Sequence, residues 1–281
     1  MLARKGNIGA KKYAIMSSLR EEYGLFDKIR VWFGVKSVVV YTMGKVGTLT
    51  ICNSLERIGV RHVHPHSLRY TRPGIHFLKI QLSVIQKIKY GIMTLLKRLK
   101  VAVWKILKRD IVIVTGVRDP YTRNISSFFE QIHYLGGLDK NLSIEDVKHL
   151  FESVCEFDAP LNWFDSEIFH VTGVNIFEYP FDKERGYAVI KKGKYKIFIY
   201  RLDRLDGLKD QLSEFIGYKN FTIESTNISE KGEYSDLMNK FKVEYKYSDV
   251  ISKKYSQSRF MRHFFSNEEI RSFAMRWNGS L

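Results

Sequence analysis

Three short, continuous apolar segments constrain the fold of this 281-residue chain more than any other feature. They are residues 37–42 (SVVVYT), 111–116 (IVIVTG) and 196–201 (KIFIYR). Strands that are apolar on both faces are typical of parallel sheets buried between two layers of helices. Patterns typical of helices separate the segments, so strand and helix alternate over residues 37–216. The sequence therefore predicts an α/β fold with a central parallel sheet and helices on both faces.

Helical patterns fill most of the remaining chain. Helices are expected near residues 13–33, 48–58, 79–108, 125–135, 144–155, 159–171 and 205–216 and from about residue 266, with a short strand at 60–64. Ser143 with Asp146 and Ser266 with Glu269 have the spacing of capping boxes at helix starts. No linker or repeat interrupts the chain. We therefore expect one domain over residues 1–281, with a core at about 37–217 and a helical part over 218–281.

The net charge of +16 is concentrated in one segment. Residues 57–109 contain 13 Lys or Arg and no Asp or Glu. Within it, residues 79–109 have apolar positions three and four apart, which predicts a basic amphipathic helix. Its basic face could be solvated, or the helix could contact a membrane surface, form a dimer seam or guide a polyanionic acceptor. No nucleic-acid partner is expected, because no helix-turn-helix, zinc-finger or RNP-like pattern is present. The oligomeric state stays open.

Residues 44–50, which follow the first predicted strand, have the pattern of an anion-binding loop. Two glycines let backbone N–H groups turn toward one point at the start of a helix, and a lysine adds an ammonium group. This is not a Walker A loop, because the lysine precedes the second glycine. A tight turn with a solvated lysine is the alternative. The candidate cofactor-binding residues here are Gly44, Lys45, Val46, Gly47, Thr48, Leu49 and Thr50.

A second candidate anchor follows the strand at residues 111–116. Arg118 emerges at the carboxyl end of this strand, where open α/β sheets bind ligands. Ser126 lies about two helical turns further on, so its hydroxyl and the Arg118 guanidinium could hold one phosphate. The alternative is a local ion pair between Arg118 and Asp119, with Pro120 marking the start of a helix.

Together, the two motifs resemble those of sulfotransferases that use 3′-phosphoadenosine-5′-phosphosulfate (PAPS). Residues 44–50 are similar to the 5′-phosphosulfate loop of that family, and residues 118–126 (RDPYTRNIS) match its 3′-phosphate motif. Residues 198–217 are similar to the strand and helix that follow. The resemblance covers about residues 37–217 and is greatest to bacterial members linked to capsular polysaccharide synthesis and to carbohydrate 2-O-sulfotransferases. It implies a P-loop-like three-layer sandwich, PAPS as co-substrate without a metal, and a carbohydrate acceptor.

Three histidines, His62, His64 and His66, occur within five residues. Histidine suits the removal of an acceptor proton near neutral pH. Carbohydrate 2-O-sulfotransferases carry a similar two-histidine segment whose second histidine is the base, which makes His66 the first candidate and His64 the second. A metal is not expected, because a fourth ligand and nearby acids are missing from this segment. We expect Pro65 to turn the chain and send one imidazole into the cleft and the other elsewhere.

The sequence thus predicts a PAPS-dependent sulfotransferase with Lys45, His66 and His64 as catalytic residues. One alternative is a P-loop-type nucleotide kinase or NTPase, which the position of the lysine disfavours. Another is a non-catalytic protein that binds polysaccharide or a membrane surface and keeps a degenerate donor site. Because the chain has two cysteines, no signal sequence and no long apolar run, we expect a cytoplasmic bacterial enzyme. The basic helix could bring it to the inner face of the membrane.

Overall fold

The computed structural model describes residues 38–68, 110–132, 142–218, 221–223 and 234–279, together with the single positions 92, 95 and 99. The chain divides into two compact units, residues 1–37 and 38–281, and all described residues belong to the second. The helix predicted at residues 13–33 therefore lies outside the described residues.

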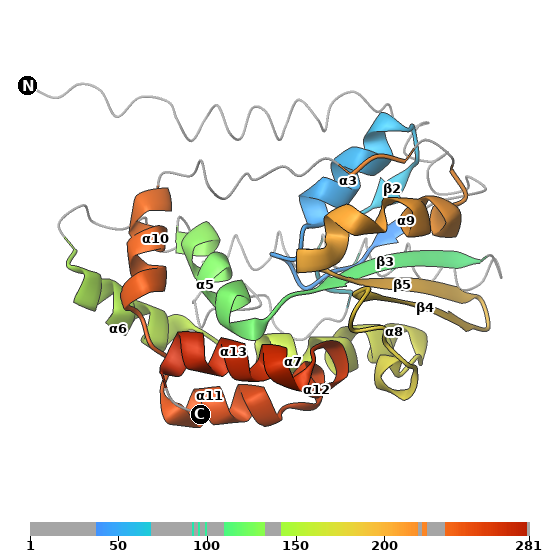
Figure 1. Cartoon of the computed structure of the whole chain (residues 1–281). Helices are drawn as coiled ribbons and strands as arrows, with labels where there is room; N and C mark the ends of the chain where they lie inside the picture. The colour runs from blue at the N-terminus through green and yellow to red at the C-terminus, as the bar shows by residue number, and fades with distance from the viewer. Residues whose placement is uncertain are drawn as a thin grey trace, which may run out of the picture. The chain divides into compact units, whose positions relative to one another are not determined.

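Five strands form one sheet at the centre of the second unit (Figure 1). In spatial order they are β2 (His62–Val63), β1 (Val38–Val40), β3 (Ile111–Val117), β5 (Tyr195–Arg201) and β4 (Tyr187–Lys192). The first four run parallel, as the apolar segments predict. β4 pairs antiparallel with β5 at the edge of the sheet. It was not predicted because only Ala188 and Ile190 within it are buried, so it lacks a continuous apolar run.

Helices cover both faces of this sheet. The helical segments of the described chain are α3 (Thr48–Arg57), α5 (Pro120–Gln131), α6 (Ile144–Val154), α7 (Ala159–Trp163), the π-helix η2 (Phe164–Phe169), α8 (His170–Thr172), η3 (Ile176–Glu178), η4 (Leu202–Leu208), α9 (Lys209–Ile216), α10 (Ser235–Glu244), α11 (Asp249–Gln257), α12 (Arg259–Phe264) and α13 (Asn267–Asn278). Figure 1 shows α3 and α9 on one face, and α7, α8 and α12 on the other.

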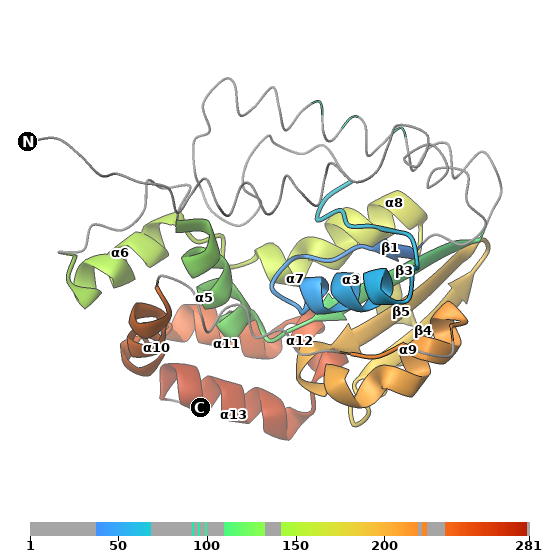
Figure 2. The ribbon, with the colours of Figure 1, turned by 90° about the horizontal axis from the view of Figure 1, so that it is seen from above.

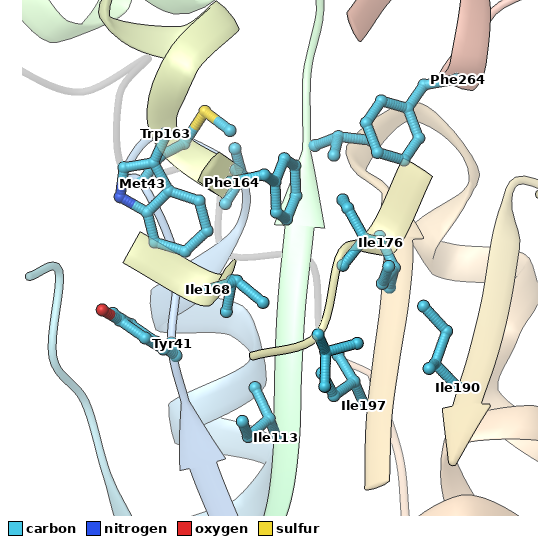
Figure 3. Close-up of a cluster of buried hydrophobic side chains, with 14 of the residues drawn as sticks. Tyr41, Met43, Ile113, Trp163, Phe164, Ile168, Ile176, Ile190, Ile197 and Phe264 are labelled. Carbon is cyan, nitrogen blue, oxygen red and sulfur yellow. The ribbon is translucent and has the colours of Figure 1, made fainter. Parts of the chain in front are cut away.

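Successive residues of β1 point to opposite faces and feed two separate clusters. Val38 and Val40 pack in the cluster that contains the buried residues of α3 and α9. Val39 belongs to the cluster on the other face, which Figure 3 shows with Ile113 and Ile197 of the sheet near the aromatic residues of α7 and η2. Burial of both faces confirms the predicted three-layer α/β arrangement.

A third, mostly aromatic cluster joins α5 and α6 to the carboxyl-terminal helices. Tyr121 of α5 stacks on Trp277 of α13 with ring planes 7° apart. The Tyr247 hydroxyl donates to the backbone carbonyl of Tyr121 at 2.7 Å. Figure 2 shows α5, α6, α10, α11 and α13 gathered beside the sheet. This cluster fixes α5, the helix that carries the second predicted anchor.

The two helix starts that capping signals predicted are found at the expected residues. Both capping boxes are present, at Ser143 and Ser266. The prediction for α5 was wrong by about five residues, because the helix begins at Pro120 rather than near residue 125. Asp119 caps it, and its carboxylate accepts a hydrogen bond from the Thr122 amide at 2.8 Å.

The predicted basic helix at residues 79–109 lies outside the described residues except at three positions. Ile92, Leu95 and Leu99 are helical, and each is about half exposed. These members of the predicted apolar stripe are therefore not buried against the sheet, and contact of this helix with a membrane surface stays a prediction. In the described part of the chain, no helix combines the length and the apolar character needed to span a membrane.

Gly116 of β3 makes room for the side chain of Tyr200 in the neighbouring strand. A Cβ added at Gly116 would lie 2.6 Å from Cζ of Tyr200 and 2.8 Å from its hydroxyl oxygen. The Tyr200 ring is fully buried, and its hydroxyl donates to the carbonyl of Val46 at 2.8 Å. The centre of the sheet is thereby tied to the glycine loop.

We expect Gly116→Ala to lower the free energy of unfolding by about 1–3 kcal/mol, because the added methyl must displace a buried ring. Urea denaturation measures the change. Gly207→Ala is the matched control, since an added Cβ there meets nothing within 4 Å and its change should stay within about 0.5 kcal/mol. Equal stabilities of the Gly116→Ala variant and the wild type would contradict this account of the sheet.

Candidate functional site

Both predicted anchors lie at the carboxyl ends of neighbouring strands. The chain leaves β1 through residues 41–47 and leaves β3 through Arg118 and Asp119. β1 lies between β2 and β3, so the chain that follows β1 turns to one side and the chain that follows β2 returns to the other. Open α/β sheets bind ligands at such a switch in strand order. The topology therefore brings the glycine loop and Arg118 to one place.

Three residues of the glycine loop have left-handed backbone conformations. The φ angles are +82° at Gly44, +62° at Lys45 and +80° at Gly47. Gly47 also needs to lack a side chain, because an added Cβ would lie 2.7 Å from Cδ1 of Leu202. Among the described residues, Lys45 is the only non-glycine with a positive φ, which costs roughly 1–2 kcal/mol. Strain of this kind clusters at ligand-binding sites.

Side-chain donors hold three carbonyl groups of the loop region. Arg123 donates to the carbonyl of Met43 at 3.1 Å, and Arg118 donates to that of Lys45 at 3.3 Å. The third carbonyl, of Val46, is held by Tyr200. In a trans peptide the N–H points opposite to the C=O of the same unit. The amides that follow these three carbonyls therefore point away from the donors and are available to an anion.

The N-terminus of α3 also favours the binding of an anion. Gly47 caps the helix without a side chain, and the first turn contains no acidic residue. The N-terminus of a ten-residue helix carries a partial positive charge. Thr48 is buried and its hydroxyl shares a hydrogen bond of 2.8 Å with the Thr42 hydroxyl. Of the other predicted loop residues, Val46 is fully buried, Thr50 is buried and Leu49 is about half exposed.

One face of α5 contacts the loop and Arg118. Thr122, Ser126 and Glu130 follow each other at intervals of four residues, so they lie on the same side of the helix. Thr122 accepts a hydrogen bond from Nε of Arg118 at 2.9 Å, and Glu130 lies 3.5 Å from the Lys45 ammonium. Ser126 is therefore flanked by one contact to Arg118 and one to Lys45. Within the described chain, its hydroxyl has no hydrogen-bond partner.

Lys45 contacts both Arg118 and Glu130, through its backbone and its side chain respectively. Its carbonyl accepts from Arg118, whereas its ammonium reaches Glu130 two helical turns beyond Thr122. Only 18% of its side chain is exposed. Burial lowers the pKa of Arg118, and a neighbouring Asp119 opposes this shift. Arginine nevertheless stays protonated in proteins, so Arg118 and Lys45 provide two cations that contact α5 one turn before and one turn after Ser126.

Both carboxylate oxygens of Asp119, the acidic residue next to Arg118, accept hydrogen bonds within α5. One carboxylate oxygen of Asp119 accepts from the Thr122 amide and the other from the Thr122 hydroxyl. In the parts of the chain that the structure describes, no three His, Cys, Asp or Glu side chains gather into a metal-binding group.

The predicted base, His66, lies directly over the glycine loop. Its Nδ1 is 2.9 Å from the Thr42 carbonyl, and a Cβ added at Gly44 would lie 3.6 Å from its Cε1. Because a carbonyl only accepts, Nδ1 carries the proton and Nε2 has the lone pair that a general base needs. The His66 ring is exposed and meets the His64 ring edge-on at 4.3 Å. The expectation that Pro65 sends the two imidazoles apart was therefore wrong.

Both ring nitrogens of His62 contact nearby residues rather than the glycine loop. Its Nδ1 lies 3.4 Å from the Val60 carbonyl and its Nε2 lies 3.7 Å from the Glu56 carboxylate. Burial lowers the pKa of His62.

A buried glutamate, which the sequence did not indicate, fixes the segment that carries His66. The Glu167 carboxylate accepts from the Ser67 hydroxyl at 2.7 Å, from the Leu68 amide at 2.9 Å and from the Tyr41 hydroxyl. Burial, and then the charge of Glu167, raise the pKa of Tyr41 well above its ordinary value, so this hydroxyl keeps its proton. Nε1 of Trp163 also donates to the His66 carbonyl at 3.2 Å. Glu167 lies in η2, and π-helical turns are frequent at functional sites.

We expect Glu167→Leu to lower the free energy of unfolding by more than about 2 kcal/mol, because three buried donors lose their acceptor. The exposed residue Glu184 provides the matched control, and Glu184→Leu should change the value by less than about 0.5 kcal/mol. Urea denaturation of both variants measures the difference. Similar stabilities of the two variants would show that Glu167 does not hold the His66 segment.

Part of the chain matches a known family of proteins. Residues 136–266 match a family model described as "Putative capsular polysaccharide synthesis protein". No curated protein and no solved structure matches the chain. The matched stretch contains Trp163 and Glu167 but not the glycine loop, Arg118 or Ser126. Over this stretch, the chain is similar to proteins associated with capsular polysaccharide synthesis.

Proposed function

We propose that the protein is a sulfotransferase that moves a sulfuryl group from PAPS to a hydroxyl of a carbohydrate, in particular of a surface or capsular polysaccharide. The observation that carries this proposal is the position of Ser126. It lies on the face of α5 between the Thr122–Arg118 and Glu130–Lys45 contacts, at the carboxyl ends of β1 and β3. The match of residues 136–266 supports the polysaccharide part of the proposal.

In this function, the donor is held by its phosphates. The 3′-phosphate accepts hydrogen bonds from the Arg118 guanidinium and the Ser126 hydroxyl. The 5′-phosphosulfate lies on the amides of residues 44–50 at the N-terminus of α3. Lys45 then leaves Glu130 and contacts the oxygen that bridges phosphorus and sulfur. More than half of the Glu130 side chain is exposed, so solvent weakens its pairing with Lys45 and little opposes this exchange.

The chemistry is a direct transfer. An acceptor hydroxyl oxygen forms a bond to sulfur while the bond from sulfur to the bridging oxygen breaks. Nε2 of His66 takes the acceptor proton, and adenosine-3′,5′-bisphosphate leaves with the bridging oxygen. Lys45 stabilises the negative charge that develops on that oxygen. His64, in ring contact with His66, orients the base or the acceptor.

The two rival functions fit the site less well. A nucleotide kinase or NTPase needs an acidic residue for magnesium, and Asp119 uses both carboxylate oxygens to cap α5. A non-catalytic binding protein would not need a histidine beside the donor loop. It would bind the donor without turnover.

The donor assignment predicts a preference for the 3′-phosphate. Adenosine-3′,5′-bisphosphate should bind at least about ten-fold more tightly than adenosine-5′-phosphate, since a charged hydrogen bond contributes roughly 1.5–3 kcal/mol. Arg118→Gln should remove most of this preference, whereas Arg185→Gln, at an exposed residue of the turn before β4, should not. Calorimetry measures the affinity of the wild-type protein and of both variants for each nucleotide. A preference that survives Arg118→Gln would overturn the assignment.

The base assignment predicts a difference between the two histidines. His66→Ala should lower turnover by about 10²–10⁴-fold with little change in donor affinity, and His64→Ala should lower it less. Transfer of ³⁵S from labelled PAPS to surface polysaccharide from the source cells measures turnover. If His64→Ala has the larger effect, the base is His64; if neither matters, this part of the mechanism is wrong.

A further inference from the structure

An open hollow of about 420 Å³ lies where α11 meets α12, apart from the glycine loop in the sequence. Its lining residues are Gln257, Arg259, Arg262 and His263. All four belong to the stretch that matches the capsular polysaccharide family, whereas the donor anchors do not. The polysaccharide association is thus carried by the part of the chain that contains this hollow.

The charges around the hollow are not balanced. Arg259 pairs with Asp165, and its guanidinium covers the ring of Phe177 at 4.0 Å. Arg262 is exposed and Lys183 is half-buried, and neither has an acidic partner within 4.0 Å among the residues that the structure describes. One ion pair and two uncompensated cations leave the hollow with a positive charge. A guanidinium with free donors suits a carboxylate ligand.

His263 is uncharged, and its pKa is sensitive to the charges around the hollow. Its ring packs edge-on against Phe177 and Phe264. Burial, and then the charges of Lys183 and Arg259, lower the pKa of His263 to about 4. The imidazole is therefore neutral at pH 7. An anion that enters the hollow opposes the effect of Lys183 and Arg259 and moves the pKa of His263 back up.

The hollow is linked to the histidine segment through one short stretch of chain. Trp163, at the end of α7, donates to the His66 carbonyl, and Asp165, two residues later, pairs with Arg259. Phe164 between them contacts Phe260 and Phe264 of α12. The segment that carries His66 and the hollow are therefore connected through residues 163–165.

We propose that this hollow binds a carboxylate-bearing sugar unit of a polymeric acceptor. The Arg262 guanidinium pairs with the carboxylate, and the Gln257 amide, which can both donate and accept, contacts sugar hydroxyls. That the bound polymer is the acceptor rests on the proposed sulfotransferase function, but binding of an acidic saccharide here does not require that function to be correct.

The test uses His263 as a local reporter, because a protein with a charge of +16 binds polyanions at other places as well. Trigalacturonate is titrated into the full-length protein, and the Cε1–H signal of His263, assigned with His263→Asn, is followed by NMR. Maltotriose is the neutral control and inorganic sulfate is the control for a bare anion. We expect trigalacturonate to raise the pKa of His263 by about one unit or more and maltotriose to leave it unchanged.

Arg262→Gln should weaken trigalacturonate binding at His263 about ten-fold, since it removes a charged hydrogen-bond donor. Arg271→Gln, at an exposed arginine of α13 outside the hollow, should have no effect. No shift with trigalacturonate, an equal response to sulfate at the same concentration, or unchanged binding by Arg262→Gln would each overturn the proposal. Adenosine-3′,5′-bisphosphate binding, measured on the same samples, tests the proposed donor site independently of the hollow.

Discussion

The hydrogen bond from the Tyr200 hydroxyl to the Val46 carbonyl connects the sheet to the site. It depends on two glycines: Gly116 leaves space for the ring, and Gly47 lets the loop approach β5 and η4. Complete burial raises the pKa of Tyr200, so the hydroxyl keeps its proton near neutral pH and remains a donor. The loop is thereby held with its carbonyls inward and its amides available. The positions of Lys45 and of the start of α3 follow from this contact.

Buried cations complete the arrangement from the side of α5. Arg123 has no exposed surface, and burial lowers its pKa to about 10, which still leaves it charged at pH 7. It holds the Met43 carbonyl, just as Arg118 holds that of Lys45. The aromatic cluster around Tyr121 and Trp277 fixes α5 itself. A positive environment of this kind favours an anionic ligand over a neutral one.

Local signals made the strands, the capping boxes and the loop predictable. The apolar runs that became β1, β3 and β5 and the serines that cap α6 and α13 act within a few residues of themselves. The remaining features depend on distant partners. Glu167 meets Ser67 across 100 residues and Lys45 meets Glu130 across 85, and no pattern within either segment encodes these contacts. β4 was missed because an edge strand needs only one buried face.

If the loop and Arg118 form a site for a 3′-phosphorylated adenosine nucleotide, the protein should prefer such a nucleotide to ATP, and this comparison is the most direct test. Calorimetry should measure the affinity of the wild-type protein for adenosine-3′,5′-bisphosphate and for ATP, each with and without magnesium. The account predicts that adenosine-3′,5′-bisphosphate binds at least about ten-fold more tightly than ATP and that magnesium does not strengthen its binding. Tighter, magnesium-dependent binding of ATP would contradict it and would favour a nucleotide kinase or NTPase.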